Sequence, residues 1–240
     1  MPPTPDWLNV ALLALLAGAT IPVGAGLASI ENIHPRWLEG ELRHTLIAFG
    51  GGALLSAVAL VLVPRGSHPL PPWAVAAAFL AGGLAFMALD LVLARRGSSA
   101  GQLVAMLSDF LPESIALGAS LATGTSAGVL LALLIALQNL PEGFNAYREI
   151  QADHPQPARP LLRRFALTAT LGPAAGLAGY FFLAHQPHAV AVLMLFSAAG
   201  ILYLTFQDIA PQVPLKQRHF PPLGAVAGFL LGLLGEMLLT

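Results

Sequence analysis

The sequence predicts an all-α integral membrane protein with eight transmembrane helices. Hydrophobic residues make up 56% of the 240 residues and charged residues only 10%, whereas an ordinary soluble domain carries about a quarter charged residues. The apolar residues gather in runs of about the length that a helix needs to cross the hydrocarbon core. None of these runs shows the alternating pattern of a transmembrane β-strand.

Eight apolar runs mark the predicted spans, which lie at residues 7–30, 44–63, 72–94, 101–123, 125–147, 165–184, 188–208 and 220–239. A soluble helix bundle would need polar outer faces, and these runs lack them. Asp6 precedes the first run without any Lys or Arg, which is the wrong flank for a secretory signal peptide. We therefore expect the first run to remain as a helix. The stretch at 151–160, QADHPQPARP, is expected to be a flexible polar linker.

The basic residues predict the orientation in the membrane. Loops after the first, third, fifth and seventh spans carry Arg36, Arg43, Arg95, Arg96, Arg148, Arg159, Arg163, Arg164, Lys216 and Arg218, and the opposite loops carry only Arg65. The positive-inside rule then places both termini outside the cytoplasm. The compact loops favour a cell inner (plasma) membrane.

Composition also excludes several classes of partner and site. The chain has no cysteine, which removes disulfides and thiolate metal sites. A net charge of −1 argues against a nucleic-acid partner. We expect no organic cofactor.

Two halves of the chain resemble each other. GATIPVGAGLA at 18–28 aligns without gaps on TATLGPAAGLA at 168–178, and FLAGGLAFM at 79–87 meets FLLGLLGEM at 229–237 at the same offset. Between them, at an offset smaller by three, Leu46, Phe49, Leu55 and Pro64 match Leu193, Phe196, Leu202 and Pro211.

This alignment predicts an inverted repeat. The first three spans (1–95) would match the last three (163–240), and the two copies would cross the membrane in opposite senses because five spans separate each equivalent pair. One transmembrane domain over 1–240 would then have a 3+2+3 architecture, with the fourth and fifth spans (100–147) in the middle. Inverted repeats are typical of secondary transporters, whose substrate site lies near the membrane midplane. The alternative is that helices rich in Gly, Ala and Leu align by composition alone.

The two middle spans carry related acidic cassettes, DFLPESIALG at 109–118 and QNLPEGFNAY at 138–147. Asp109 and Glu113 are four residues apart and share one helix face, and Gln138 and Glu142 repeat this spacing. Because a short connection joins the two spans, the four oxygen-bearing side chains are expected to converge near the midplane.

Ionised carboxylates at this depth cost a few kcal/mol each on insertion scales, and intramembrane acids are functional candidates by default. Clustered carboxylates also repel one another, and no Lys, Arg or His lies in these two spans at that depth. A divalent cation is the most economical partner.

The prolines favour the same interpretation. Pro112 and Pro141 each precede a glutamate, and a proline inside a helix disturbs the carbonyl four residues earlier, here Ser108 and Leu137. A carbonyl freed at membrane depth needs a partner, which a metal or a cavity water supplies. The alternative is polar contacts between helices, with the acids bonded to Asn139, Asn145, Ser108 or Ser114.

The cassettes DFLPESIALG and QNLPEGFNAYRE, with eight spans and external termini, resemble the ZIP (Zrt/Irt-like) divalent-metal transporters. The resemblance covers most of the chain and is most specific over 105–149. It implies import of a divalent cation towards the cytoplasm through a site between the fourth and fifth spans, and a homodimer. Carried over position by position, the resemblance implies metal ligands at Asp109, Glu113, Gln138 and Glu142, with Asn139 where a second metal would be bridged.

The chain departs from the family pattern at several positions. Family members have His-Asn where this chain has Asp109 and Phe110, and some have a glutamate where it has Gly172. Phe110 and Gly172 therefore predict one metal per protomer. The histidine-rich loop between the third and fourth spans is replaced by RRGSSAG.

The carboxylate that replaces imidazole leaves an all-oxygen site. Such a site suits harder cations such as Mn²⁺, with Fe²⁺ or Mg²⁺ also possible, better than Zn²⁺. Carboxylates also bind zinc, so Zn, Mn, Fe and Cd all remain candidate substrates.

Other polar residues are candidates for a metal pathway, namely Asp90, Asp208 and Glu236; solvation at the membrane surface is the alternative for each. The HExxH motif is absent and we expect no enzyme. Two rival functions stay open. One is a metal sensor or scaffold of the same fold that does not transport, and the other is an intramembrane metal-dependent hydrolase with Glu142 as its base.

Overall fold

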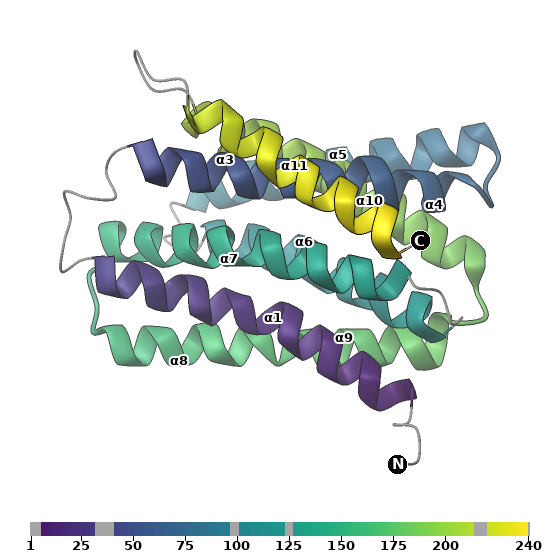
Figure 1. Cartoon of the computed structure of the whole chain (residues 1–240), viewed down its shortest axis with the longest axis horizontal. Helices are drawn as coiled ribbons and strands as arrows, with labels where there is room; N and C mark the ends of the chain where they lie inside the picture. The colour runs from purple at the N-terminus through teal and green to yellow at the C-terminus, as the bar shows by residue number, and fades with distance from the viewer. Residues whose placement is uncertain (1–5, 32–40, 97–100, 123–126, 214–219, 240) are drawn as a thin grey trace.

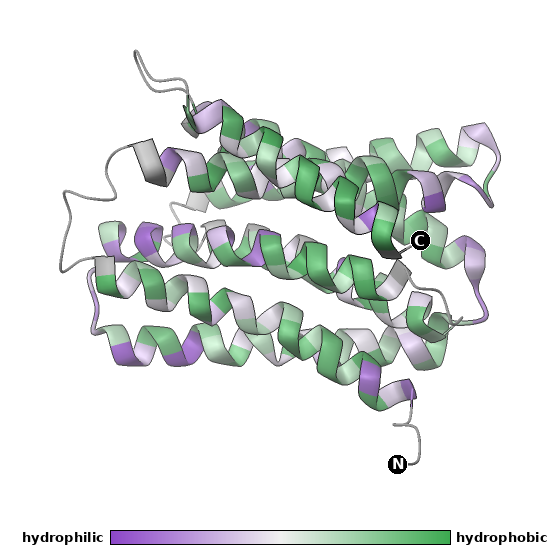
Figure 2. Cartoon of the chain, in the orientation of Figure 1, coloured by the Kyte–Doolittle hydropathy of each residue, from purple (hydrophilic) through white to green (hydrophobic). Residues whose placement is uncertain are grey.

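The computed structural model describes residues 6–31, 41–96, 101–122, 127–213 and 220–239. Every regular element in these residues is a helix. Seven segments are long and apolar enough to cross a membrane, at Asp6–Ile30, His44–Ser67, Pro72–Leu93, Gly128–Asp153, Ala158–Leu183, Pro187–Gln207 and Phe220–Leu238. The hydropathy colouring in Figure 2 shows mainly hydrophobic residues along these helices. The predicted all-α class is confirmed, and these seven segments have the length and composition of membrane spans.

The helices follow one another as α1 (Asp6–Glu31), α3 (Glu41–Ser56), α4 (Val63–Ser67), α5 (Pro72–Arg96), α6 (Gly101–Ala122), α7 (Ala127–Asp153), α8 (Ala158–Ala169), α9 (Leu171–Ala178), α10 (Pro187–Leu204) and α11 (Phe220–Leu239). Three π-helical turns, η1 (Ala57–Leu62), η2 (Gly179–Leu183) and η3 (Thr205–Ile209), lie between or after them, and a 3₁₀ turn, η4 (Ala210–Gln212), follows η3. Thus α3, η1 and α4 form one continuous segment, and α9 runs directly into η2.

Helix α6 corresponds to the predicted fourth span. It is 22 residues long, which is enough to cross the hydrocarbon core. Ser108, Asp109 and Glu113 interrupt its apolar sequence. These polar residues make α6 a candidate for binding.

Two layers of helices lie against each other (Figure 1). One layer holds α1, α6, α7, α8 and α9, and the other holds α3, α4, α5, α10 and α11. The most extensive packing joins α1 to α7, α3 to α11, and α5 to α10, each pair within one layer.

Glycines allow close packing within these pairs. A Cβ at Gly24 of α1 would collide with the carbonyl oxygen of Leu140 on α7, and a Cβ at Gly143 of α7 would collide with that of Ile21 on α1. Small residues are enriched at helix contacts in membranes because they let the backbones approach. The contact between α1 and α7 therefore fixes the helix that carries the second cassette.

The linker expected at 151–160 is mostly helical, which corrects that prediction. Helix α7 continues to Asp153 and α8 begins at Ala158, so only residues 154–157 connect them. The side chain of Gln151 donates to the carbonyl of Gln156 and accepts from its N–H, at 2.8 Å in both cases. These two bonds fix a connection that composition alone indicated as flexible.

Candidate metal centre

The two cassettes meet through a buried hydrogen bond. The Nε2 group of Gln138 on α7 donates to Oε2 of Glu113 on α6 at 2.5 Å. Both side chains are completely buried, each with 0% of its surface exposed. Helices α6 and α7 pack along each other, and both continue through their prolines, Pro112 and Pro141. A carboxylate and an amide from different helices therefore share one site inside the protein.

Glu142 lies one helical turn beyond Gln138 on α7 and is also buried, with 7% of its surface exposed. The preceding residue, Pro141, faces α3, where a Cβ at Gly50 would lie only 2.5 Å from the Cγ atom of Pro141. This part of α7 is thus at the contact between the two layers. Pro141 therefore faces the other layer, whereas Asn139 bonds to α1 in its own layer.

Asn139 is fully buried and donates from Nδ2 to the carbonyl oxygen of Ala17 on α1 at 3.2 Å. Its Oδ1 atom, like Oε1 of Gln138, accepts no hydrogen bond from any residue that the structure describes. Leaving a buried acceptor unsatisfied costs about 1–3 kcal/mol. These two amide oxygens are therefore able to bind a cation or a water molecule.

Two predicted residues cannot be placed in the site. Asp109 belongs to α6 and Asp208 to η3, but their side chains lie outside the described residues. Among the side chains that are described, no three His, Asp or Glu residues lie together as a metal-binding group. Glu113, Gln138, Asn139 and Glu142 are thus the candidate ligands whose side chains the structure places.

Phe110 forms an apolar wall beside the candidate ligands. Its ring is fully buried on α6 and lies against two glycines, Gly18 of α1 and Gly172 of α9. A Cβ at Gly18 would lie 2.9 Å from the Cζ atom of Phe110, and a Cβ at Gly172 would lie 2.6 Å from it. The phenyl ring therefore occupies the space that larger side chains at positions 18 and 172 would need.

The candidate pathway residues have different surroundings. The Tyr203 hydroxyl of α10 donates to Oδ2 of Asp90 on α5 at 3.0 Å. This bond joins two helices of the layer that holds α3, α4, α5, α10 and α11. Glu236 is partly buried on α11.

Four buried hydroxyl residues were not predicted from the sequence, namely Ser56, Ser120, Ser197 and Thr205. Ser56 donates to the carbonyl of Ala53, whereas Ser197 Oγ and Thr205 Oγ1 have no hydrogen-bond partner among the described residues. A hydroxyl inside an apolar run was the only sequence signal for them. It is a weak signal because Ser and Thr commonly bond to their own helix backbone.

The electrostatics of the site are set by its acids. Of the buried side chains that the structure describes, Glu113 and Glu142 are the charged ones, and neither Lys nor Arg is buried with them. A charge buried without compensation is strongly unfavourable. The arrangement can therefore bind a cation or a proton through oxygen atoms.

Comparisons with known proteins do not identify the family. A scan against protein-family models and a search of curated proteins both find no match. Function has to be argued from the residues of the site.

Proposed function

We propose that the protein transports a divalent metal cation, imports it towards the cytoplasm, and belongs to a divergent ZIP-like group that works as a homodimer in a cell membrane. The observation that carries this proposal is the completely buried hydrogen bond from Gln138 to Glu113. It links two proline-containing helices of a protein whose other long helices are apolar enough to cross a membrane. Acidic residues at such a depth are typical of ion pathways.

The ligand set supports a cation as the substrate. Glu113 and Glu142 supply carboxylates, and Gln138 and Asn139 have amide oxygens that accept no hydrogen bond within the described residues. All these donors are oxygens, which suit Mn²⁺ and other hard cations. Asp109, one turn before Glu113 on α6, would add a further carboxylate.

We propose one metal per protomer. The ring of Phe110 lies against Gly18 and Gly172 and leaves an apolar wall on that side of the ligands. No side-chain oxygen comes from position 172, because it is a glycine. This packing supports a single site.

Helix packing supports the inverted repeat. In the predicted repeat, α1 corresponds to the segment of α8 and α9, α3 corresponds to α10, and α5 corresponds to α11. The packing of α3 on α11 should then recur as the packing of α10 on α5. Both contacts are extensive. The aligned residues Phe49 and Phe196 also make equivalent contacts with glycines. The carbonyl oxygen of Phe49 lies where a Cβ at Gly228 would be, and the carbonyl oxygen of Phe196 lies where a Cβ at Gly82 would be.

Metal uptake into liposomes tests the proposed function. Purified protein is reconstituted, and accumulation of Mn²⁺, Fe²⁺, Zn²⁺ and Cd²⁺ is compared between the wild type and Glu142→Ala. We expect saturable uptake of at least one cation by the wild type and its loss in the variant. Uptake that equals that of protein-free liposomes for all four cations would contradict transport.

One observation favours a different function. Glu113 already accepts a hydrogen bond from Gln138, and such a bond is also what a purely structural contact between helices provides. A metal sensor or scaffold with this fold would bind metal without accumulating it. Metal binding by the detergent-solubilised protein combined with no uptake would identify this alternative.

A further inference from the structure

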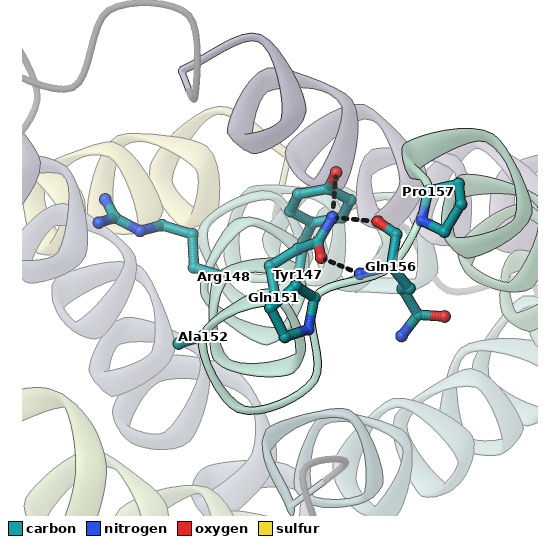
Figure 3. Close-up of a pocket in the computed structure, with 7 residues that line it drawn as sticks. Tyr147, Arg148, Gln151, Ala152, Gln156 and Pro157 are labelled. Atoms are coloured by element: carbon teal, nitrogen blue, oxygen red, sulfur yellow. Dashed lines mark hydrogen bonds between the residues drawn. The ribbon is translucent and has the colours of Figure 1, made fainter.

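A cavity of about 670 Å³ lies at the end of α7, where the chain turns into α8. Its lining comprises Tyr147, Arg148, Gln151, Ala152, Pro155, Gln156 and Pro157 (Figure 3). The two helices that flank it, Gly128–Asp153 and Ala158–Leu183, are both apolar enough to cross a membrane. Because the cavity lies where both helices end, it belongs to the membrane surface. None of its residues is a proposed metal ligand, so the inference does not depend on metal transport.

Hydrogen bonds hold the wall of this cavity in shape. Gln151 donates to the Tyr147 hydroxyl at 3.1 Å and is bonded twice to the backbone of Gln156. The Tyr147 ring, which is 1% exposed, packs on Phe165 of α8 at 6.2 Å between ring centroids. The cavity is therefore preformed, as most sites for small molecules are.

One arginine lines the cavity, and a second is bonded to a lining residue. In Figure 3, Arg148 extends on the opposite side of Tyr147 from Gln156 and Pro157, and its guanidinium carbon lies 5.9 Å from the centre of the Phe144 ring. Arg164 donates to Oε1 of Gln156 at 3.3 Å. One positive charge thus belongs to the cavity lining, and a second lies within hydrogen-bond distance of the lining residue Gln156.

The surrounding charges increase this positive character. Arg159 and Arg163 are exposed in the first two turns of α8, and the acids nearby in the sequence are Glu149 and Asp153 of α7. The end of α7 and the first two turns of α8 therefore carry four arginines and two acidic residues. The first turn of α8 contains no acidic residue and its N-cap, Pro157, provides no side-chain bond. Positive side chains at the positive end of a helix are unfavourable in isolation, and an external anion would relieve this.

Tyr147 offers a further donor. Its hydroxyl accepts the bond from Gln151, and within the described residues no acceptor is found for its own O–H. This buried hydroxyl belongs to the cavity lining. An anion in the cavity would therefore have a neutral donor as well as guanidinium groups.

We propose that this cavity binds the phosphate group of an anionic phospholipid. Arg148 and Arg164 would hold the phosphate from two sides, and the Tyr147 hydroxyl would donate to it. The volume falls in the range of about 300–1,000 Å³ that is usual for ligand sites. Basic pockets at the cytoplasmic ends of transmembrane helices bind anionic headgroups, and position at the membrane surface selects a lipid over a free anion.

Thermal unfolding of the full-length protein in uncharged detergent tests the proposal. The protein is titrated with dioleoyl phosphatidylglycerol, dioleoyl phosphatidylcholine or inorganic phosphate, and the melting temperature gives an apparent Kd for each. We expect phosphatidylglycerol alone to stabilise the wild type. Arg148→Gln and Arg164→Gln should each weaken its binding roughly tenfold, which is the order expected for one charge-assisted hydrogen bond.

Arg95→Gln is the matched control, because Arg95 is an exposed arginine at the end of α5, a helix that does not flank the cavity, and it does not belong to the cavity lining. This variant should bind phosphatidylglycerol like the wild type. An equal loss of affinity in Arg95→Gln would show diffuse charge attraction and overturn the proposal. Equal stabilisation by phosphatidylcholine or by inorganic phosphate would also overturn it, and these two comparisons need only the wild type.

Discussion

At the scale of single residues, the hydrogen bond between Glu113 and Gln138 has two separable roles. It satisfies buried polar groups, and its carboxylate is a proposed metal ligand. An amide at position 113 would still offer an oxygen to Gln138 but would carry no charge. Structure and metal binding can therefore be tested with different substitutions.

We expect Glu113→Ala to destabilise the protein by about 1–3 kcal/mol, because it leaves the buried Gln138 amide without its acceptor. Glu113→Gln should retain most of the stability and still lose metal uptake. Thermal unfolding in detergent and uptake into liposomes measure the two effects. Normal uptake by Glu113→Gln would remove this residue from the proposed ligands.

A second prediction at this scale concerns metal preference. Asp109→His would replace an oxygen ligand by imidazole, which favours zinc over manganese. We expect a higher ratio of zinc to manganese uptake than in the wild type. Competition assays with both cations measure that ratio, and an unchanged ratio would argue against Asp109 as a ligand.

At the scale of helices, the contact between α3 and α7 connects the two layers beside the site. Gly50 of α3 faces the ring of Pro141, and Glu142 is the next residue. A methyl group at position 50 must push the proline ring away, and Glu142 would move with it.

We therefore expect Gly50→Ala to reduce metal uptake several-fold while the protein still folds, since small overpacking costs about 1–3 kcal/mol. Gly83→Ala is the control, because a Cβ at Gly83 of α5 meets no atom within 4 Å. Initial rates of uptake for both variants decide this prediction. If Gly50→Ala transports as fast as Gly83→Ala, this contact does not position Glu142.

The helices show which features of the fold can be predicted from local sequence signals. The apolar runs predicted the helices well because burial in lipid makes length and hydrophobicity sufficient signals. Spacing within the cassettes also predicted that α6 and α7 would present polar faces. The contacts of these two helices with α1 and α9 could not be predicted, because the bond from Asn139 to Ala17 and the contact of Phe110 with Gly172 join residues far apart in the chain.

The connection between α7 and α8 was predicted wrongly for a related reason. Residues 151–160 are polar and contain prolines, which indicates a flexible linker by composition. The bonds of Gln151 to Gln156 depend on a specific turn, and composition carries no information on it.

At the scale of the whole molecule, the number of membrane crossings sets the topology. Seven helices are clearly apolar enough to cross the membrane, and α6 is the eighth long helix. With α6 crossing, we expect from the positive-inside bias that the loop that contains His68 lies outside and that the loop that contains His154 lies in the cytoplasm. Both histidines are exposed.

The absence of cysteine from the chain allows a direct test of this topology. In intact cells, a membrane-impermeant maleimide should label His68→Cys and leave His154→Cys unlabelled until the cells are opened. His185→Cys should behave like His68→Cys, because α8 and α9 lead back across the membrane. Labelling of His154→Cys in intact cells would reverse the predicted orientation.

We propose that oxygen atoms of α6 and α7 hold a divalent cation inside the membrane. Anomalous diffraction from crystals grown with Mn²⁺ or Cd²⁺ tests it most directly. We expect one anomalous peak per protomer, within coordination distance of Glu113, Gln138 and Glu142. This peak should be lost in Glu142→Ala. Ordered side chains at these positions with no peak between them, or with metal bound only at the protein surface, would contradict it.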